Sequence, residues 1–277
     1  MTLSILTLNL WHNSGPWDRR RERIREWVER LDPDVIAFQE ALRGEGYDQA
    51  TEILGEGRYH VDFVHGSPFW RGQDYSFGNA IASRWPFASR QELKLPDRGD
   101  GETRAAISVE IEAPFGPLSF TCTHLHWRFH HGPTREQQVA ALCQQVLSGR
   151  QKGGFPPIIA GDFNAEPDSD EIRFMTGGHS IDGRSVYFHD AWRVAGEAGD
   201  GKTWSNRNSY VRPNLEPDRR IDYIFTGYPL KGGVGMLKRC RVVCDDERDG
   251  VWPSDHFGVW AELHTEEIPS LSAETDE

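Results

Sequence analysis

The chain has 277 residues, of which 37% are hydrophobic and 11% aromatic, so it is long enough to bury a sizeable core in one domain. Its formal net charge is -12, and an acidic surface disfavours indiscriminate binding to phosphate backbones without excluding nucleic acid at a locally neutralised site. The amino terminus alternates instead of forming a basic and then a long apolar stretch, and no apolar run approaches membrane-spanning length. We therefore expect a soluble protein without a signal peptide or transmembrane segment.

The first elements along the chain predict a β-α-β unit. The stretch from Ser4 to Leu10 is predicted to be a strand. Apolar residues then recur at helical spacing from Asp18 to Leu31, and Pro33 ends the helix. The stretch 34–40, DVIAFQE, is predicted to be a buried strand that ends in Glu40.

Both halves of the remaining chain mix strands and helices. Helices are predicted at 135–147 and 170–175, and the loop 148–157 is expected to separate two halves. Two β-rich sheets facing each other, with helices outside, would accommodate this pattern. Strands are predicted at 59–64, 79–83, 105–111, 118–125, 158–160, 220–226, 237–244 and 258–263.

The carboxyl-terminal segment is acidic, and the four cysteines are scattered along the chain. Residues 265–277 carry five acidic residues and no basic one, which predicts a disordered tail after a domain of residues 1–264. The cysteines form no CxxC pattern, so we expect free, mostly buried thiols and a reducing, cytoplasmic location. The cysteines are Cys122, Cys143, Cys240 and Cys244.

A carboxylate and an amide follow a buried apolar run in the stretch 158–167, IIAGDFNAEP. Residues two apart on an extended chain point to the same side, so Asp162 and Asn164 can face one cavity while Phe163 returns to the core. Burying an ionised carboxylate is unfavourable unless a cation or hydrogen-bond donors compensate it. The sequence therefore predicts a positive charge opposite Asp162.

The same pattern of polar residues at strand ends recurs along the chain. Each residue alone has an ordinary structural explanation, such as capping or pairing with a neighbouring arginine. Together, carboxylates from four separated stretches, one of them next to a histidine, are what an oxygen-ligated divalent cation and a phosphate ester require. The further members of this set are Asn9, Glu40, His124, Asp222, Asp255 and His256.

These residues lie in six of seven short stretches; the seventh is GNAIASRWP, and the six are LTLNLW, FQE, THLHW, AGDFNAEP, RRIDYIF and SDHFGV. In their order and spacing along the chain, over residues 3–263, the seven stretches resemble the endonuclease/exonuclease/phosphatase superfamily, which has the deoxyribonuclease-I-like fold. GDFN and SDH are a strong joint signal, and the polar segment that leads into the predicted strand with Asp222 resembles that of small bacterial phosphodiesterase-like members. The resemblance implies an α/β protein, a four-layer αββα sandwich of two mostly antiparallel sheets with outer helices.

The resemblance also implies a Mg²⁺ site at one edge of the two sheets, with Mn²⁺ as a possible substitute. Glu40 would ligate the metal, with Asn9 beside it and Asp255 near it. Some members carry an acidic residue two positions after the first asparagine, where this chain has Trp11. A single metal centred on Glu40 is therefore expected rather than two.

By the same analogy, five residues would act on the substrate. Asp162 would position the attacking water, and Asn164 would hold a phosphate oxygen. His124 and His256 would contact the phosphate, and Asp222 would orient His256. The expected reaction is in-line attack of water on a phosphodiester rather than a monoester, with either His256 or Asp162 accepting the proton.

The substrate class follows less directly from the residues. The acidic body without a basic stripe favours a small or lipid-like phosphodiester, and a DNA or RNA nuclease of the same superfamily is the alternative. Aromatic and polar residues in loops near the expected metal edge are able to stack on or bind a substrate, or to pack a small loop core. The candidate substrate contacts are Asn79, His126, Trp127, Arg128, Trp70, Arg71, Asn206 and Tyr210.

Two further classes of protein fit the sequence less well. The stretch HLHWRFHH places His124, His126, His130 and His131 within eight residues, which suggests a zinc hydrolase. We rank it lower because His130 and His131 are expected in a solvated loop and the other candidate ligands suit Mg²⁺. An inactive binding module on the same fold is the other alternative, although no protein partner is evident.

Overall fold

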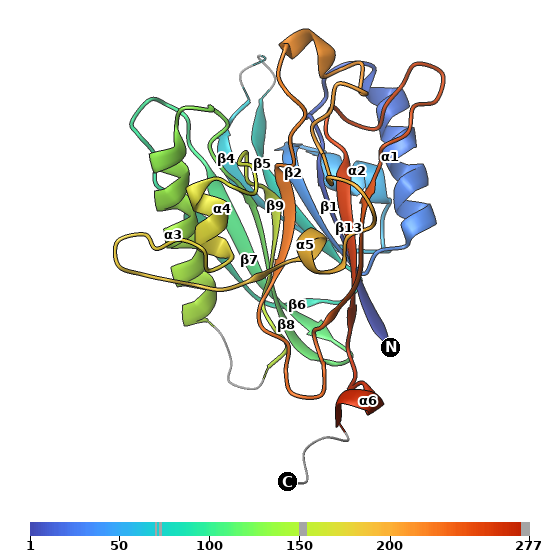
Figure 1. The fold of residues 1–277 in the computed structure, drawn as a ribbon. Helices are drawn as coiled ribbons and strands as arrows, with labels where there is room; N and C mark the ends of the chain where they lie inside the picture. Colours follow the sequence, from blue (N-terminus) through green and yellow to red (C-terminus); the bar gives the residue numbers. More distant parts are fainter. Residues whose placement is uncertain (70, 72–73, 150–153, 273–277) are drawn as a thin grey trace.

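Two sheets lie face to face at the centre of the computed structural model, which describes residues 1–69, 71, 74–149 and 154–272 (Figure 1). The first sheet contains β1 (Thr2–Asn9), β2 (Val35–Gly44), β3 (Tyr47–Asp48), β4 (His60–Pro68), β5 (Tyr75–Ser83), β12 (Leu237–Val243) and β13 (Gly258–His264). The second contains β6 (Phe87–Lys94), β7 (Ala105–Ala113), β8 (Gly116–His124), β9 (Ile158–Asp162), β10 (His189–Asp190) and β11 (Asp222–Thr226). Their orders are β12-β13-β1-β2-β5-β4, with β3 on β2, and β10-β11-β9-β8-β7-β6.

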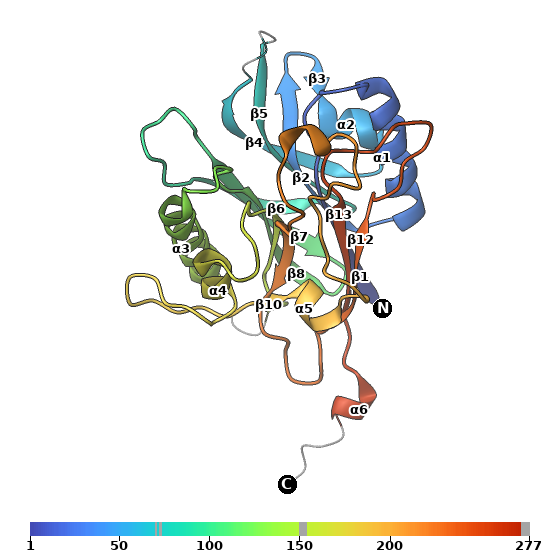
Figure 2. The same ribbon diagram turned by 45° about the horizontal axis from the view of Figure 1, so that its top comes forward.

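Helices cover the outer faces of both sheets, on opposite sides of the molecule (Figures 1 and 2). Two lie on the first sheet, α1 (Trp17–Leu31) and α2 (Gln49–Leu54), and two on the second, α3 (Gly132–Ser148) and α4 (Asp170–Met175). Shorter helices are α5 (Ala191–Ala195), the 3₁₀ turn η1 (Arg212–Asn214) and α6 (Pro269–Ser272). Strand pairing is antiparallel except for β1 with β2 and β8 with β9. The predicted αββα sandwich of mostly antiparallel sheets is confirmed.

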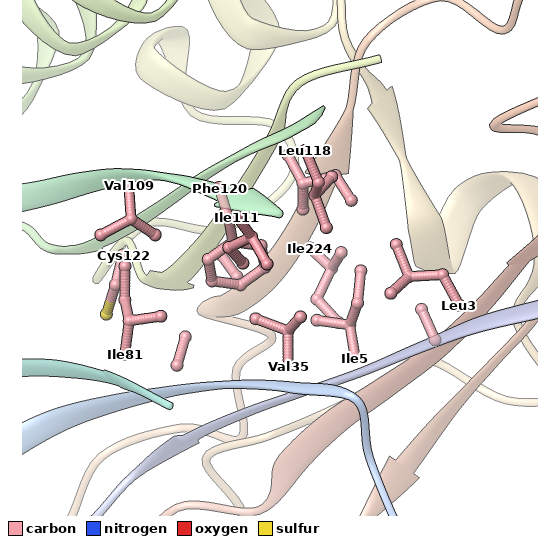
Figure 3. Packing of buried hydrophobic residues seen from close by; sticks show 14 of the residues in the cluster. Leu3, Ile5, Val35, Ile81, Val109, Ile111, Leu118, Phe120, Cys122 and Ile224 are labelled. Carbon is pink, nitrogen blue, oxygen red and sulfur yellow. The ribbon is translucent and has the colours of Figure 1, made fainter. Parts of the chain in front are cut away.

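Alternating side chains divide the apolar residues between the central core and the outer layers. Ile5 and Val35 point into the central cluster between the sheets (Figure 3). Their neighbours in sequence, Leu6 and Ile36, pack on the opposite face with α1 and α2. Successive side chains of a strand point to opposite faces, and here both faces are buried. This is why the central strands are continuous apolar runs in the sequence.

The loop 148–157 does not separate two structural units, contrary to the prediction. The strands on either side of it, β8 and β9, are parallel neighbours in one sheet. Two strands from the second half, β12 and β13, complete the first sheet through the pairing of β13 with β1. α3 lies in the crossover connection between the parallel strands β8 and β9. In the sequence, a helix followed by a loop rich in glycine and proline looks the same in such a crossover as at a domain boundary.

Other differences from the sequence predictions are local. β6 and the short elements β3, β10, α2 and α5 were not predicted, and β6 is a mostly exposed edge strand without a strong apolar pattern. The predicted tail begins with ordered residues at 265–272. The backbone N–H of Ile268 donates to the Gly232 carbonyl over 2.8 Å, and α6 follows. Residues 273–277 lie outside the described residues. All four cysteines are free and buried, as predicted.

No helix in the described part of the chain combines the length and apolar character needed to cross a membrane.

Gly161 permits the close approach of β8 and β9 directly below the polar strand ends. It has φ 153°, and a Cβ there would lie 2.0 Å from the Thr123 carbonyl oxygen. We expect Gly161→Ala to lower the free energy of unfolding by more than about 3 kcal/mol, because backbone must move. The control Gly57→Ala has a left-handed φ but no atom within 4 Å, so its cost should be about 1 kcal/mol. Equal effects in urea denaturation would contradict the close approach.

Candidate active site

Several strands that end in polar residues converge at one edge of the sandwich. The end of β1 at this edge lies away from the amino terminus in Figure 1. Asn9 ends β1, His124 ends β8 and Asp162 ends β9. Asp222 begins β11 directly opposite Asp162, because the two strands are antiparallel. His256 lies two residues before β13. Five residues spread over nearly the whole sequence therefore meet at one place.

Glu40 reaches the same edge through a bulge in β2. The pairing of β2 with β5 shifts register between Phe38 and Ala41, and Glu40 has φ 55°. A left-handed conformation is unfavourable for a non-glycine residue, and such bulges often re-aim a side chain at functional sites. The prediction that β2 ends at Glu40 is therefore wrong, because β2 continues to Gly44.

Asp162 is the centre of the cluster. Asn9 Nδ2 donates to its Oδ2 over 3.0 Å, and the backbone N–H of Asn164 donates to its Oδ1 over 2.9 Å. The Nε2 atoms of His124 and His256 lie 3.5 Å and 3.8 Å from Oδ2. Burial and the charge of Asp222 raise the pKa of Asp162 to about 6. A carboxylate with two imidazoles and an amide around it can hold and deprotonate a water molecule.

His256 is held in its charged form by carboxylates. Its Nδ1 lies 2.9 Å from Asp222 Oδ2. Burial alone would lower the pKa of His256, but Asp222, Asp162 and Asp255 raise it to about 10. At neutral pH the ring therefore donates from both nitrogens, from Nδ1 to Asp222 and from Nε2 into the pocket.

His124 is held neutral by Arg104, a residue that the sequence analysis missed. Arg104 Nη1 lies 3.2 Å from His124 Nδ1. Arginine has only donors, so Nδ1 must accept and the ring proton is on Nε2, facing Asp162. Burial and the charge of Arg104 hold the pKa of His124 well below its usual value. Arg104 precedes a predicted strand without any motif around it, so no sequence signal marked it.

The residues predicted to hold a metal form a second group beside this one. Burial and the charge of Asp255 raise the pKa of Glu40 to about 7, and burial raises that of Asp255. Asn9 connects this group to the catalytic cluster, since its amide donates to Asp162. A half-buried and a buried carboxyl thus have raised pKa values in spite of the nearby charge of His256, and their oxygens are ligands that Mg²⁺ prefers. This donor set fits a divalent ion.

These groups line one pocket of about 970 Å³. Glu40, Asp162, Asn164, Asp255 and His256 are among its lining residues, whereas Asn9 and Asp222 contact the lining residues Asp162 and His256. Its walls combine aromatic rings with two buried arginines, each paired with a glutamate, Arg104 with Glu102 and Arg219 with Glu216. The aromatic lining residues are Trp11, Phe69, Phe77, Trp127 and Trp204.

Among the predicted substrate contacts that the structure describes, Trp127 lines this pocket and the others do not. Asn79 is buried and donates to the Ala105 carbonyl, and Asn206 donates to Asp218. The amides of both residues therefore serve the fold. Sequence alone did not reveal these partners, which come from other segments.

The other predicted contacts surround the pocket without lining it. Tyr210 packs on Trp11, with ring centroids 5.0 Å apart, and the Arg128 guanidinium lies over the Trp127 ring. Arg71 is exposed, and its charge contributes to lowering the pKa of His12. The remaining candidate, Trp70, lies outside the described residues.

The histidine-rich stretch divides between two places. His124 belongs to the cluster around Asp162, whereas His126 and His131 form a separate group with Asp100. His126 Nδ1 accepts from the backbone N–H of Arg128 over 3.2 Å, so its proton is on Nε2 and faces His131 Nδ1, 3.1 Å away. His131 is buried, contrary to the expectation of a solvated loop, whereas His130 is exposed. A zinc ion bound to Nε2 of His126 would have to displace this proton, and the ring could then no longer be neutral while Nδ1 accepts from Arg128.

Two facing sheets with a cluster of carboxylates, amides and imidazoles at one edge are typical of the hydrolases of the αββα-sandwich class. The profile of the Endonuclease/Exonuclease/phosphatase family matches residues 6–256. The chain belongs to this family, whose members are phosphoester hydrolases and generally use divalent metal ions.

Individual relatives are distant. Nocturnin from Xenopus laevis is 22% identical over 92% of this chain and 66% of its own length, and human Nocturnin is 22% identical over 92% and 60%. The chain thus spans about two thirds or less of these relatives. Among solved structures, TDP2 from D. rerio complexed with single strand DNA product has a TM-score of 0.74 at 19% identity, covering 95% of this chain and 99% of that one. A family protein from Bacteroides vulgatus has a TM-score of 0.73 at 18% identity, covering 96% and 100%.

Proposed function

We propose that this protein is a Mg²⁺-dependent phosphodiesterase that hydrolyses its substrate by in-line attack of water. The observation that carries the proposal is the set of groups around Asp162. One buried carboxylate is surrounded by an amide, a neutral imidazole and an imidazolium, and the carboxylate and both rings line a single pocket. An acceptor for the water proton and donors for developing phosphate charge are the components that such hydrolysis needs.

The roles follow from the protonation states. Asp162 orients the attacking water and accepts its proton. The imidazolium of His256, held by Asp222, and the Nε2 proton of His124, set by Arg104, stabilise the charge that develops on the phosphate oxygens. Asn164 has a left-handed φ of 51°, and its backbone N–H is fixed on Asp162, which holds the residue beside the phosphate position.

Glu40 and Asp255, with Asn9 beside them, would hold the metal. A bound divalent ion supplies positive charge for the non-bridging and leaving oxygens of the phosphate. The side chain at Trp11 offers no oxygen where some family members have an acidic residue, so one ion is proposed rather than two. Mn²⁺ should substitute because it accepts the same oxygen ligands.

The pKa values predict the pH profile of kcat/KM. Asp162 must be ionised and His256 protonated, so kcat/KM should fall below about pH 6 and above about pH 10. The charge of Asp222 raises both pKa values, so both limbs should move to lower pH in Asp222→Asn. A profile that keeps both limbs in Asp222→Asn would assign the titration to other groups.

A nuclease is the second candidate function. Exposed Trp127 and Phe129 near the pocket offer faces on which bases can stack, and TDP2, which has the same fold, was solved with single strand DNA product. The acidic charge of the chain opposes a long grip on a polyanion, so we place a small or lipid-like diester first.

A substrate panel with Mg²⁺ and with chelator separates these candidates. It should contain bis(4-nitrophenyl) phosphate, 4-nitrophenyl phosphate, sphingomyelin, single-stranded DNA, RNA and supercoiled plasmid. We expect hydrolysis of the diester above the monoester, weak activity on plasmid, and loss of activity in His256→Ala. Plasmid nicking at low enzyme would favour the nuclease. No hydrolysis of any substrate would favour an inactive binding module.

A further inference from the structure

Arg20 is a completely buried arginine whose hydrogen bonds all go to backbone carbonyls. Its Nε donates to Ser14, and its two Nη atoms donate to Leu10, Trp11 and His12, over 2.8–3.2 Å. Nη1 also donates to the Pro253 carbonyl over 3.1 Å. A buried cation is usually paired with a carboxylate. Because Arg20 instead donates to five backbone carbonyls, we expect it to stabilise the backbone segments that contain them.

The carbonyls belong to the two loops that carry proposed metal ligands. The first follows Asn9, and it contains two successive left-handed residues, Trp11 at φ 53° and His12 at φ 36°. Such a loop is strained and persists only when its surroundings hold it. The guanidinium holds it from within, and the rings of Trp11 and Trp17 lie 5.0 Å and 5.2 Å from its centre.

The second loop precedes Asp255 and is fixed to the first at the same place. Ser254 Oγ donates to the Asn9 carbonyl over 2.7 Å and lies 3.2 Å from Asp255 Oδ1. The Trp11 N–H donates to Asn9 Oδ1 over 2.9 Å, which turns the Asn9 amide toward Asp162. Arg20 therefore binds the first loop one residue after Asn9 and the second loop two residues before Asp255.

We propose that Arg20 is a positioning residue that preassembles the metal site by joining the loop after Asn9 to the loop before Asp255. The planar guanidinium provides five donors in a fixed fork, whereas a lysine provides three on one nitrogen and cannot reach five carbonyls. The inference rests on the proposed metal site. It adds that a residue of α1, which does not line the pocket, determines how tightly this site binds the metal ion.

The charge of Arg20 allows geometry to be separated from electrostatics. The positive charge of Arg20, near Glu40 and Asp255, repels a metal ion bound there. If Arg20 acted only through its charge, removing that charge would strengthen metal binding. If Arg20 acts through geometry, Arg20→Gln weakens metal binding in spite of the lost repulsion. Arg20→Lys, with a basic group but the wrong donor geometry, weakens it as well.

Arg135 provides the matched control. It is also buried, donates to the carbonyls of His126, Arg128 and Phe129, and pairs with Glu171. Its carbonyls belong to a loop that carries no proposed metal ligand. Arg135→Gln should therefore reduce stability without changing metal affinity.

The experiment is a calorimetric titration of Mn²⁺ into the full-length wild type, Arg20→Gln, Arg20→Lys and Arg135→Gln, with urea denaturation in chelator for each. We expect the dissociation constant of Mn²⁺ to rise at least about tenfold in both Arg20 variants and to stay near the wild-type value in Arg135→Gln. The inference would be overturned if a folded Arg20 variant were less stable than the wild type but bound Mn²⁺ with wild-type affinity. If the wild type binds neither Mn²⁺ nor Mg²⁺, the proposed metal site itself fails. Arg20→Lys decides the test if Arg20→Gln does not fold.

Discussion

Asp162→Asn is expected to lower kcat on a phosphodiester by about 10³-fold with little change in KM, because general-base catalysis typically contributes 10²–10⁴. The amide has the size of the carboxylate but cannot accept the water proton. It also places a donor where Asn9 already donates and where the Nε2 atoms of His124 and His256 lie 3.5 Å and 3.8 Å away. Steady-state kinetics with saturating Mg²⁺ would measure the loss.

The loss should not reflect unfolding. The pKa of Asp162 is raised to about 6 in the fold, so its ionised form opposes folding above that pH and the neutral amide removes this cost. The variant should therefore be at least as stable as the wild type at pH 7 in chelator. Asp190→Asn is the control, because this buried aspartate pairs with Arg220 outside the pocket and should affect stability only. A folded Asp162→Asn with wild-type kcat would remove Asp162 from the mechanism.

Glu40→Gln is expected to reduce the rate at least about 100-fold at a Mg²⁺ concentration that saturates the wild type. The substitution removes the negative charge of Glu40, which the bulge in β2 directs toward the proposed metal position. Part of the rate should return at higher metal concentration, since Asp255 remains. The measurement is the dependence of rate on Mg²⁺ for both proteins.

Its control is Glu52→Gln, which removes a glutamate that pairs with Arg21 on the outer helices. That variant should keep the wild-type dependence on Mg²⁺. An unchanged dependence in Glu40→Gln would instead place the metal elsewhere or remove it from the reaction.

Much of the fold could be predicted because it depends on local patterns. The apolar runs of β1 and β2, and the helical spacing of α1, are readable along single segments. Asp162 and Asn164 line one pocket as predicted, but β9 ends at Asp162, and a turn with a left-handed Asn164 brings the two together instead of strand alternation. The spacing of the motifs added the remaining cluster. The assignment of roles to these residues stays a prediction.

What the sequence did not reveal depends on partners from other segments. The bulge at Glu40 arises from the pairing of β2 with β5, so β2 alone reads as a strand that stops. Arg104 and Arg20 carry no motif, and their importance comes from an imidazole and from carbonyls that only the fold brings near them. Asn206 had the right chemistry for a ligand, but Asp218 already uses its amide.

The most direct test of the account is anomalous scattering from crystals soaked in Mn²⁺. The account predicts one peak in the pocket, bounded by the carboxylates of Glu40 and Asp255, which disappears in Glu40→Gln. A peak between Asp100, His126 and His131 with none beside Glu40, or no peak at any concentration that supports activity, would contradict it.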